Sequence, residues 1–240
     1  MGLFDKKFCD FCGGKIGLLG NRKLADGNMC KNCAEAITPY LVGRKQYSVS
    51  DMKAHLASRE ANKEQLAGFN ATRSLGINTK VHIDDNQKLL LVTSSRRYKE
   101  ENPDIVDFSQ VTGCILDVVE TKQEETKKDA EGKTISYTPP RYKLYYDFNI
   151  TINFNHPWFD QIKFKVNQNR IDGRASIEFK DTERQANEIC ETLKNLHNQV
   201  REEAVEAAKP KTSVTCPGCG ASTLPDQNGR CEYCGGAIGG

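Results

Sequence analysis

The sequence lacks any long apolar run. None of its segments approaches the roughly 20 consecutive apolar residues that a membrane-spanning helix needs. The first residues, from Met1 to Lys6, contain no apolar stretch of the kind that defines a secretory signal. Lys6 also stands where an N-myristoylation motif requires serine or threonine. We therefore expect a cytoplasmic protein without a transmembrane segment, in a compartment that keeps thiols reduced.

An excess of charge of one sign is also absent. The chain has 34 basic and 32 acidic residues, a net charge of +2. Residues 1–70 carry 11 basic and 7 acidic residues, which is the most basic part of the sequence. Nucleic-acid-binding proteins usually concentrate a much stronger basic excess on one element, so the charge pattern gives this class little support.

Familiar catalytic motifs are missing too. There is no Gly-x-Ser-x-Gly, no glycine-rich phosphate loop and no His-Glu-x-x-His. Among the four histidines, His156 is the one to inspect for a site, because it shares a turn with Trp158, the only tryptophan. We interpret this segment as a proline turn whose tryptophan anchors the β-rich domain. His55 is interpreted as a surface or hydrogen-bonded residue, and Asp84-Asp85 as a solvated turn.

Cysteine, in contrast, is abundant. Eight of the ten cysteines form four Cys-x-x-Cys pairs, two near each end of the sequence. The two N-terminal pairs are separated by 17 residues and the two C-terminal pairs by 11. Two intervening residues let both thiolates of a turn reach one metal ion, and a second turn completes a tetrahedron of sulfurs. The sequence therefore predicts two structural zinc ions, held by Cys9, Cys12, Cys30 and Cys33 and by Cys216, Cys219, Cys231 and Cys234.

Glycines and histidines support this interpretation. Glycine follows Cys12, Cys219 and Cys234, where a metal-binding knuckle often needs a positive φ. No histidine lies within either cluster, so each site is closed and leaves no position for water or substrate. Redox Cys-x-x-Cys motifs and disulfides fit less well, because no βαβ pattern is present and the expected compartment is reducing. Iron could replace zinc at a four-cysteine site.

The two remaining cysteines have a different setting. Cys114 lies in a strand-like run and Cys190 on the apolar face of a helix. We interpret both as small buried hydrophobic residues rather than nucleophiles.

The rest of the chain alternates between predicted helices and strands. A helix over 49–69 has Ser48 as its N-cap with Asp51 in the first turn, and a final helix over 182–207 has a capping box at Thr182 and Gln185. A charged segment over 121–140 reads as a long exposed hairpin tip, and 209–212 as a linker. The strands are predicted at 80–83, 88–93, 105–108, 112–120, 143–154, 161–166 and 175–179.

About seven strands followed by one amphipathic helix resemble a pleckstrin-homology-like domain. The segments Asp107-Phe108-Ser109-Gln110-Val111-Thr112-Gly113-Cys114 and Ile152-Asn153-Phe154-Asn155-His156-Pro157-Trp158 resemble parts of its strand-turn-strand structure. The resemblance implies an α+β fold in which a β-barrel or sandwich carries a C-terminal helix, flanked by two small four-cysteine zinc modules. The domains are then expected at 1–47 (zinc module), 48–72 (connecting helix), 73–208 (pleckstrin-homology-like domain) and 209–240 (zinc ribbon).

The terminal modules carry resemblances of their own. Cys9-Asp10-Phe11-Cys12-Gly13-Gly14-Lys15 through Cys30-Lys31-Asn32-Cys33, followed by the capped helix, resembles an uncharacterised bacterial four-cysteine domain with a treble-clef-like arrangement. Cys216-Pro217-Gly218-Cys219-Gly220 with Cys231-Glu232-Tyr233-Cys234-Gly235-Gly236 resembles short zinc ribbons. Neither resemblance implies a known activity.

Three hypotheses for function follow. The first is a non-enzymatic, zinc-stabilised interaction or adaptor protein that binds another protein, at a membrane surface in one version of the hypothesis. The second is nucleic-acid binding through the zinc modules, with basic residues at Lys15, Arg22, Lys23, Arg44 and Lys45, although ordinary solvated charge explains them as well. The third is an enzyme whose site the sequence does not reveal.

Overall fold

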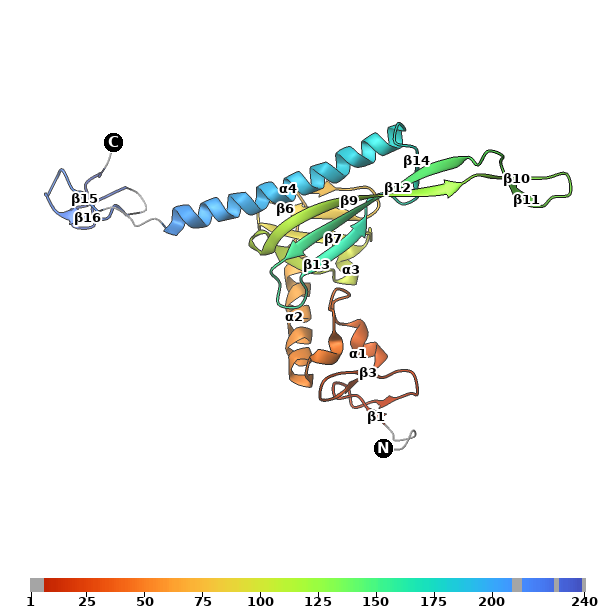
Figure 1. Cartoon of the computed structure of the whole chain (residues 1–240). Helices are drawn as coiled ribbons and strands as arrows, with labels where there is room; N and C mark the ends of the chain where they lie inside the picture. The colour runs from red at the N-terminus through yellow and green to blue at the C-terminus, as the bar shows by residue number, and fades with distance from the viewer. Residues whose placement is uncertain (1–6, 209–212, 227–228, 239–240) are drawn as a thin grey trace. The chain divides into compact units, whose positions relative to one another are not determined.

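The structure is a computed structural model that describes residues 7–208, 213–226 and 229–238 (Figure 1). The predicted linker at 209–212 and the N-terminal residues 1–6 lie outside these ranges. The chain divides into two compact units, Met1–Asn198 and Gln199–Gly240. No helix of the described residues has the length and apolar character needed to cross a membrane.

Two short antiparallel hairpins build the N-terminal module and are joined to each other by a side chain. The amide of Asn28 donates to Asp10 Oδ2 at 2.6 Å, which ties the second hairpin to the first. A Cβ atom on Gly27 would lie 2.4 Å from Val49 Cγ2, so the turn of the second hairpin approaches the next helix as only glycine allows. The elements of the module are β1 (Lys7–Phe8), β2 (Lys15–Ile16), β3 (Arg22–Lys23), β4 (Asn28–Met29), α1 (Lys31–Glu35) and η1 (Arg44–Gln46).

Helix α2 (Val49–Gly68) begins at the predicted cap. Ser48 Oγ accepts from the amide of Asp51, and the Asp51 carboxylate accepts from the amide of Ser48, which confirms the capping box. The buried face of the helix contains His55 and Arg59 as well as apolar residues. His55 is only 1% exposed, so its surface placement is wrong and the hydrogen-bonded alternative holds.

The first sheet has the strand order β5-β6-β7-β8 and is antiparallel throughout. β5 was not predicted, because its three residues are largely exposed and show no apolar alternation. Asp84, at the end of β6, is buried and accepts from the amides of Asn86 and Gln87, so the solvated turn describes Asp85 alone. The strands and the helix between the last two are β5 (Arg73–Leu75), β6 (Lys80–Asp84), β7 (Leu89–Thr93), α3 (Tyr98–Glu101) and β8 (Ile105–Asp107).

The second sheet is built around β12, whose alternate residues are buried as predicted. Its buried side chains include Phe148, Ile150 and Ile152, which are fully inaccessible to solvent. β12 pairs with β9 along most of its length and with β13 and β14 on its other side. The members of this sheet, which follow the 3₁₀ turn η2 (Phe108–Gln110), are β9 (Val111–Glu124), β12 (Tyr142–Phe154), β13 (Gln161–Lys165) and β14 (Ile171–Asp172).

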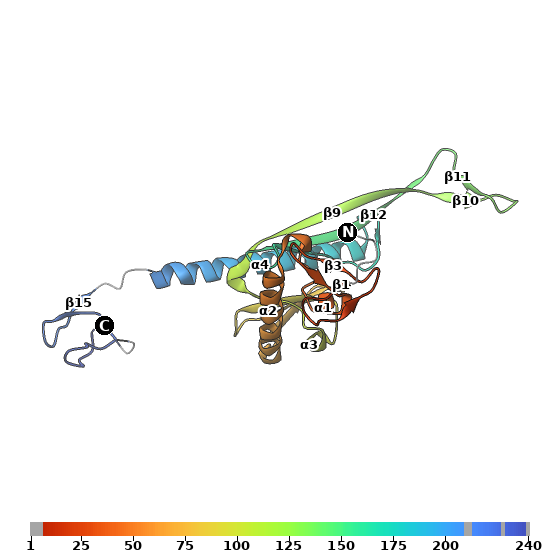
Figure 2. The same ribbon diagram turned by 90° about the horizontal axis from the view of Figure 1, so that it is seen from below.

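The hairpin formed by β9 and β12 extends well beyond the sheet (Figure 2). β13 pairs only with residues 149–153 of β12, and β14 only with Tyr145 and Tyr146. The hairpin then continues into a smaller antiparallel pair, β10 (Thr126–Lys128) and β11 (Thr134–Ser136). The structure therefore confirms the exposed hairpin predicted over 121–140.

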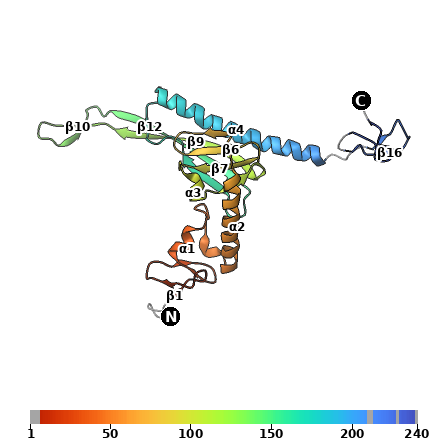
Figure 3. The ribbon, with the colours of Figure 1, turned by 180° about the vertical axis from the view of Figure 1, so that it is seen from behind.

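Helix α4 (Ile177–Ala208) begins five residues before the predicted start, and its part within the first unit, up to Asn198, lies along both sheets (Figure 3). Ser176 Oγ accepts from the amide of Phe179, and the Phe179 ring packs edge-on against Tyr146 and Phe148. The predicted strand at 175–179 and the capping box at Thr182 are therefore wrong. The predicted strand was too short for alternation to be informative, and Thr182 is 1% exposed inside the helix. The apolar stripe at Ala186, Ile189, Leu193 and Leu196 is buried as predicted.

The strands do not close into the barrel that was one form of the expected fold. Within the described residues, the two four-stranded sheets share no ladder, and η2 separates β8 from β9. The edge strands β5 and β8 have only three residues each, which leaves little length over which sheet edges could pair. The architecture is a mixed helix and sheet structure with open sheets.

A buried polar network fastens the N-terminal module to the first sheet. Asp104, just before β8, accepts from Thr38 Oγ1 and from Arg59 Nη1, each at 2.6 Å. Arg59 also donates to the carbonyl of Asn102. Trp158 adds an apolar contact by packing against the core of the module around Leu24, Met29 and Met52. The sequence predicted that Trp158 anchors the β-rich domain. In the structure, Trp158 joins the N-terminal module to that β region.

The C-terminal unit is a small module of hairpins. β15 (Val214–Thr215) pairs with β16 (Ser222–Thr223), and isolated bridges join Pro225 to Cys231 and Arg230 to Ala237. Its buried centre consists of Cys216, Cys231 and Ile238.

Removing the charge of Asp104 should destabilise the first unit. We expect Asp104→Asn to lower the free energy of unfolding by about 3 kcal/mol, because it leaves the buried Arg59 guanidinium without an anion. Asp85→Asn is the matched control: its pair with Arg73 has the same 2.6 Å distance, but the side chains are 40% and 43% exposed. The control should cost less than about 1 kcal/mol. Urea unfolding followed by Trp158 fluorescence measures both, and equal losses would contradict the buried network.

Candidate metal centres

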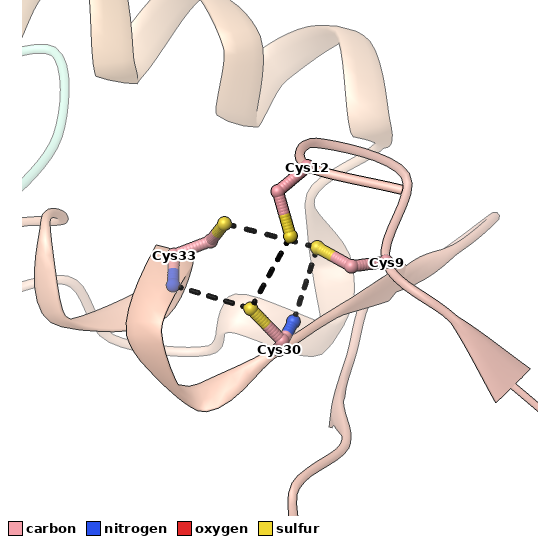
Figure 4. A group of neighbouring side chains, drawn as sticks. All are labelled: Cys9, Cys12, Cys30 and Cys33. Atoms are coloured by element: carbon pink, nitrogen blue, oxygen red, sulfur yellow. Dashed lines mark hydrogen bonds between the residues drawn. The ribbon is translucent and has the colours of Figure 1, made fainter. Parts of the chain in front are cut away.

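The first cysteine cluster combines a tight turn with the start of a helix (Figure 4). Cys9 and Cys12 lie in the turn between β1 and β2, where the amide of Cys9 donates to the carbonyl of Gly14, and that of Gly13 to the carbonyl of Cys9. Cys30 is the N-cap of α1, and Cys33 lies in its first turn. The local hydrogen bonds of the turn and of the helix cap thus aim all four side chains at one point.

The four sulfurs of this cluster lie within 4.8 Å of one another. Cys9 Sγ is 3.8 Å from Cys33 Sγ, and Cys12 Sγ is 3.8 Å from Cys30 Sγ. Backbone amides point toward the sulfurs: the amide of Cys30 donates to Cys9 Sγ at 3.3 Å, and that of Cys33 to Cys30 Sγ at 3.4 Å. Such donors stabilise negative charge on sulfur.

The second cluster is built from two tight turns of the same design as the first turn. The amides of Cys216 and Cys231 each donate to the carbonyl five residues ahead at 2.8 Å. The sulfurs of Cys216 and Cys234 are 3.5 Å apart, and those of Cys219 and Cys231 are 3.7 Å apart. All four again lie within 4.8 Å of one another.

The glycine that follows each turn has the backbone conformation that the sequence predicts. The φ angles of Gly13, Gly220 and Gly235 are +70°, +72° and +66°, in the left-handed region that other residues adopt at a cost. The pair Cys30/Cys33 needs no such glycine because it lies at a helix N-terminus. The structure thus brings all eight predicted cysteines into two groups, as four-sulfur sites require.

Within each cluster, the thiols differ strongly in acidity. Burial disfavours the thiolate of Cys9, but amide donors at Cys12, Cys30 and Phe11 outweigh it and lower the pKa to about 6. Burial and the neighbouring thiols raise the pKa of Cys33. Amides of Cys219 and Gly218 lower the pKa of Cys216 to about 6, although burial opposes them. The Gly236 amide favours the thiolate of Cys234, yet the neighbouring thiols raise its pKa to about 12.

These shifts show what the clusters can do chemically. Amide donors prepare one thiolate in each cluster, and the neighbouring sulfurs disfavour the thiolates of Cys33 and Cys234 at neutral pH. A divalent cation at the centre would relieve that repulsion and allow all four thiolates to form. The donor sets therefore suit a soft or borderline cation with four sulfur ligands.

The histidines are placed as structural groups rather than as ligands of these clusters. His55 Nε2 accepts from the amide of Thr38 at 3.0 Å, and its ring lies 4.7 Å from that of Trp158. His156 Nδ1 accepts from the amide of Trp158 at 3.3 Å, and its ring packs on Phe159. Both rings line a cavity of about 410 Å³ that also contains Asp104.

Sequence reasoning missed two groups of residues. The network of Thr38, Arg59 and Asp104 has no local motif, because its members come from three separate elements. Cys114 and Cys190, interpreted as buried hydrophobic residues, are partly exposed and line one recess. The only available signal was that these two cysteines remain when the eight clustered ones are set aside.

Comparison with known proteins adds one finding. A family model described as a domain of unknown function, DUF4428, matches residues 7–55. The match includes the whole first cluster and the start of α2, so it agrees with the predicted N-terminal four-cysteine domain. No curated protein and no solved structure matches the chain.

The buried His55 should make stability depend on pH. Burial, then the charge of Arg59 and the neighbouring His156, lower the pKa of His55 from 6.5 to about 4. As the pH falls below 6.5, His55 therefore becomes protonated in the unfolded chain while it stays neutral in the folded chain. The resulting loss of stability grows to the order of 3 kcal/mol near pH 4 and then levels off.

The matched variant is His55→Gln, whose side-chain oxygen can accept from the amide of Thr38 without titrating. Urea unfolding at pH 7.5, 6.5 and 5.5 should show wild type losing more stability than the variant as the pH falls. Protonation of the cluster thiolates affects both proteins alike, so the difference isolates His55. Parallel pH profiles would contradict the neutral, buried ring.

Proposed function

We propose that each cysteine cluster binds one zinc ion that stabilises its module and takes no part in catalysis. A tetrahedron with zinc–sulfur distances of ~2.3 Å has sulfur–sulfur edges of ~3.8 Å. The measured distances of 3.5–3.8 Å fit these edges. Four thiolates fill the coordination sphere of zinc, so neither site has a position for water or substrate.

The two modules then belong to different types of zinc scaffold. The turn at Cys9 and Cys12, combined with ligands at the start of α1, supports a treble-clef-like finger. Two equivalent turns support a zinc ribbon at the C-terminus. The central region has two antiparallel sheets followed by one helix. Along the chain come β5 to β8, then β9, β12 and β13, and then α4. This is the order expected of a pleckstrin-homology-like domain.

We further propose that the protein is a non-enzymatic adaptor that binds another protein by strand addition along β9. The observation that supports this is the edge of β9: the strand has 14 residues, pairs with β12 on one side apart from a bulge at Thr112, and pairs with no other strand of the described chain. Unpaired edge amides and carbonyls are a template for an extended segment of a partner. Side chains of Ile115 and Val119, 56% and 40% exposed, offer apolar contacts beside that edge.

An enzyme remains the weaker candidate. Its only support is the cavity of about 410 Å³ with His55, His156 and Asp104 in its lining. One nitrogen of each ring accepts from a backbone amide, and Asp104 already accepts from Thr38 and Arg59. We therefore propose that these groups hold the N-terminal module in place and perform no acid–base chemistry.

The metal proposal predicts two zinc ions per chain by elemental analysis. The double variant Cys12→Ser/Cys33→Ser should hold one and should shift the emission of Trp158, which packs in the same cluster as Cys33. Cys219→Ser/Cys234→Ser should also hold one but leave the emission unchanged, since the known contacts of Trp158 lie within the first unit. Fewer than two ions in wild type, or iron in place of zinc, would refute the proposal.

The adaptor proposal predicts that charge on β9 abolishes partner capture. The double variant Ile115→Lys/Val119→Lys places two charges beside the edge, which disfavours strand addition. Leu18→Lys/Leu19→Lys is the matched control, because both leucines are 88% exposed in a turn of the N-terminal module. Proteins that wild type recovers from a lysate should be retained by the control and lost by the β9 variant.

Photo-crosslinking from position 115 then identifies the chemistry of the partner. Crosslinks to one protein segment support strand addition. A nuclease-sensitive complex that dissociates steeply with salt would instead support the basic residues of the N-terminal module as the binding surface and would overturn the proposal.

A further inference from the structure

Two cysteines outside the metal clusters meet where β9 crosses α4. Cys114 lies near the start of β9 and Cys190 in the middle of α4. Both line the same recess, and neither forms a disulfide. Both side chains are partly exposed, so small molecules in solution can reach them.

The surroundings of the pair form a recess of about 360 Å³. Both cysteines line it, together with Lys194 and His197 on the same helix. Lys194 lies one turn after Cys190 and Glu191 follows Cys190 directly, so charges of both signs line the recess. Apolar walls come from Val111 and Leu193. The recess therefore admits a small reactant to both cysteines.

The two thiols have different roles. The neighbouring Cys114 thiol lowers the pKa of Cys190, although burial opposes this. The neighbouring Cys190 thiol, together with burial, raises the pKa of Cys114. Cys190 is therefore the more readily ionised sulfur, and Cys114 keeps its proton until Cys190 has reacted. An attacking thiolate next to a resolving thiol is the arrangement found at redox-active cysteine pairs.

We propose that Cys114 and Cys190 form a reversible dithiol–disulfide site that small hydroperoxides oxidise, independently of the two metal clusters. The Cys190 thiolate attacks one oxygen of hydrogen peroxide, the O–O bond breaks, and the departing hydroxide takes up a proton to become water. Cys190 is then a sulfenic acid. The sulfur of Cys114 attacks the sulfur of Cys190, and its proton leaves with the hydroxyl group as a second water. In total, two thiols and one hydrogen peroxide give one disulfide and two waters. An external dithiol then reduces the disulfide to two thiols and is itself oxidised to a disulfide.

The disulfide would join the sheet covalently to α4. In the reduced protein, α4 is held there by side-chain packing such as that of Phe179 and Ile189. Crosslinking residues so far apart in sequence restricts the unfolded chain and so favours the folded one. Oxidation should therefore raise the midpoint of thermal unfolding by about 5–10 °C.

The test treats the full-length, zinc-loaded protein with hydrogen peroxide at neutral pH and then alkylates the remaining thiols. Peptide mapping should find a crosslinked peptide containing Cys114 and Cys190, with zinc still bound, and a dithiol should restore both free thiols. The midpoint of unfolding should rise on oxidation of wild type and stay unchanged in Cys114→Ser/Cys190→Ser.

Single variants test the assigned roles. In Cys114→Ser, Cys190 should accumulate as a sulfenic acid that dimedone labels. In Cys190→Ser, Cys114 should remain unlabelled. Serine is close in size to cysteine, and circular dichroism checks that each variant is folded. The proposal is overturned if both thiols stay alkylatable after oxidation, if the single variants react equally, or if the oxidant first ejects zinc and links cluster cysteines.

Discussion

The arrangement of four sulfurs around one point is the constraint on which each terminal module depends. The N-terminal module contains few fully buried apolar side chains, and its strands have only two residues each. Hairpins of that length are not stable by themselves in water. The turn at Cys9 and the helix cap at Cys30 direct their cysteine side chains to one point. This convergence joins the short hairpins and α1 into one module. Binding of a metal ion at either cluster would therefore be coupled to the folding of these segments.

The N-terminal module is also held by the β region. Trp158, from the end of the second sheet, packs with Met52 and its neighbours, and Asp104 joins Thr38 to Arg59 beside it. The contact of Trp158 is apolar, and that of Asp104 is a buried network of hydrogen bonds. Together they explain why residues 1–198 form one compact unit although the sequence suggests separate modules. A change at the first metal cluster would consequently reach the sheets through Trp158.

The features that could be predicted from the sequence are local ones. The spacing of the cysteines, the cap at Ser48 and the alternation in β12 each involve residues within a few positions of one another. The start of α4 was misplaced because Phe179 is fixed by rings on β12 rather than by its own neighbours in sequence. The contact between Cys114 and Cys190 and the role of Asp104 likewise depend on how separate elements cross. No period or spacing in the sequence encodes those crossings.

The long hairpin has a further consequence for how this protein can vary. Where β9 and β12 run beyond β13 and β14, each strand has only the other as a neighbour, so its length is independent of the core. Adding two residues to each strand would extend the ribbon by roughly 7 Å and keep every side chain on its original face. Adding one residue to one strand would reverse the faces beyond that point. The length of the hairpin can thus change in steps of two residues per strand while the rest of the molecule stays the same.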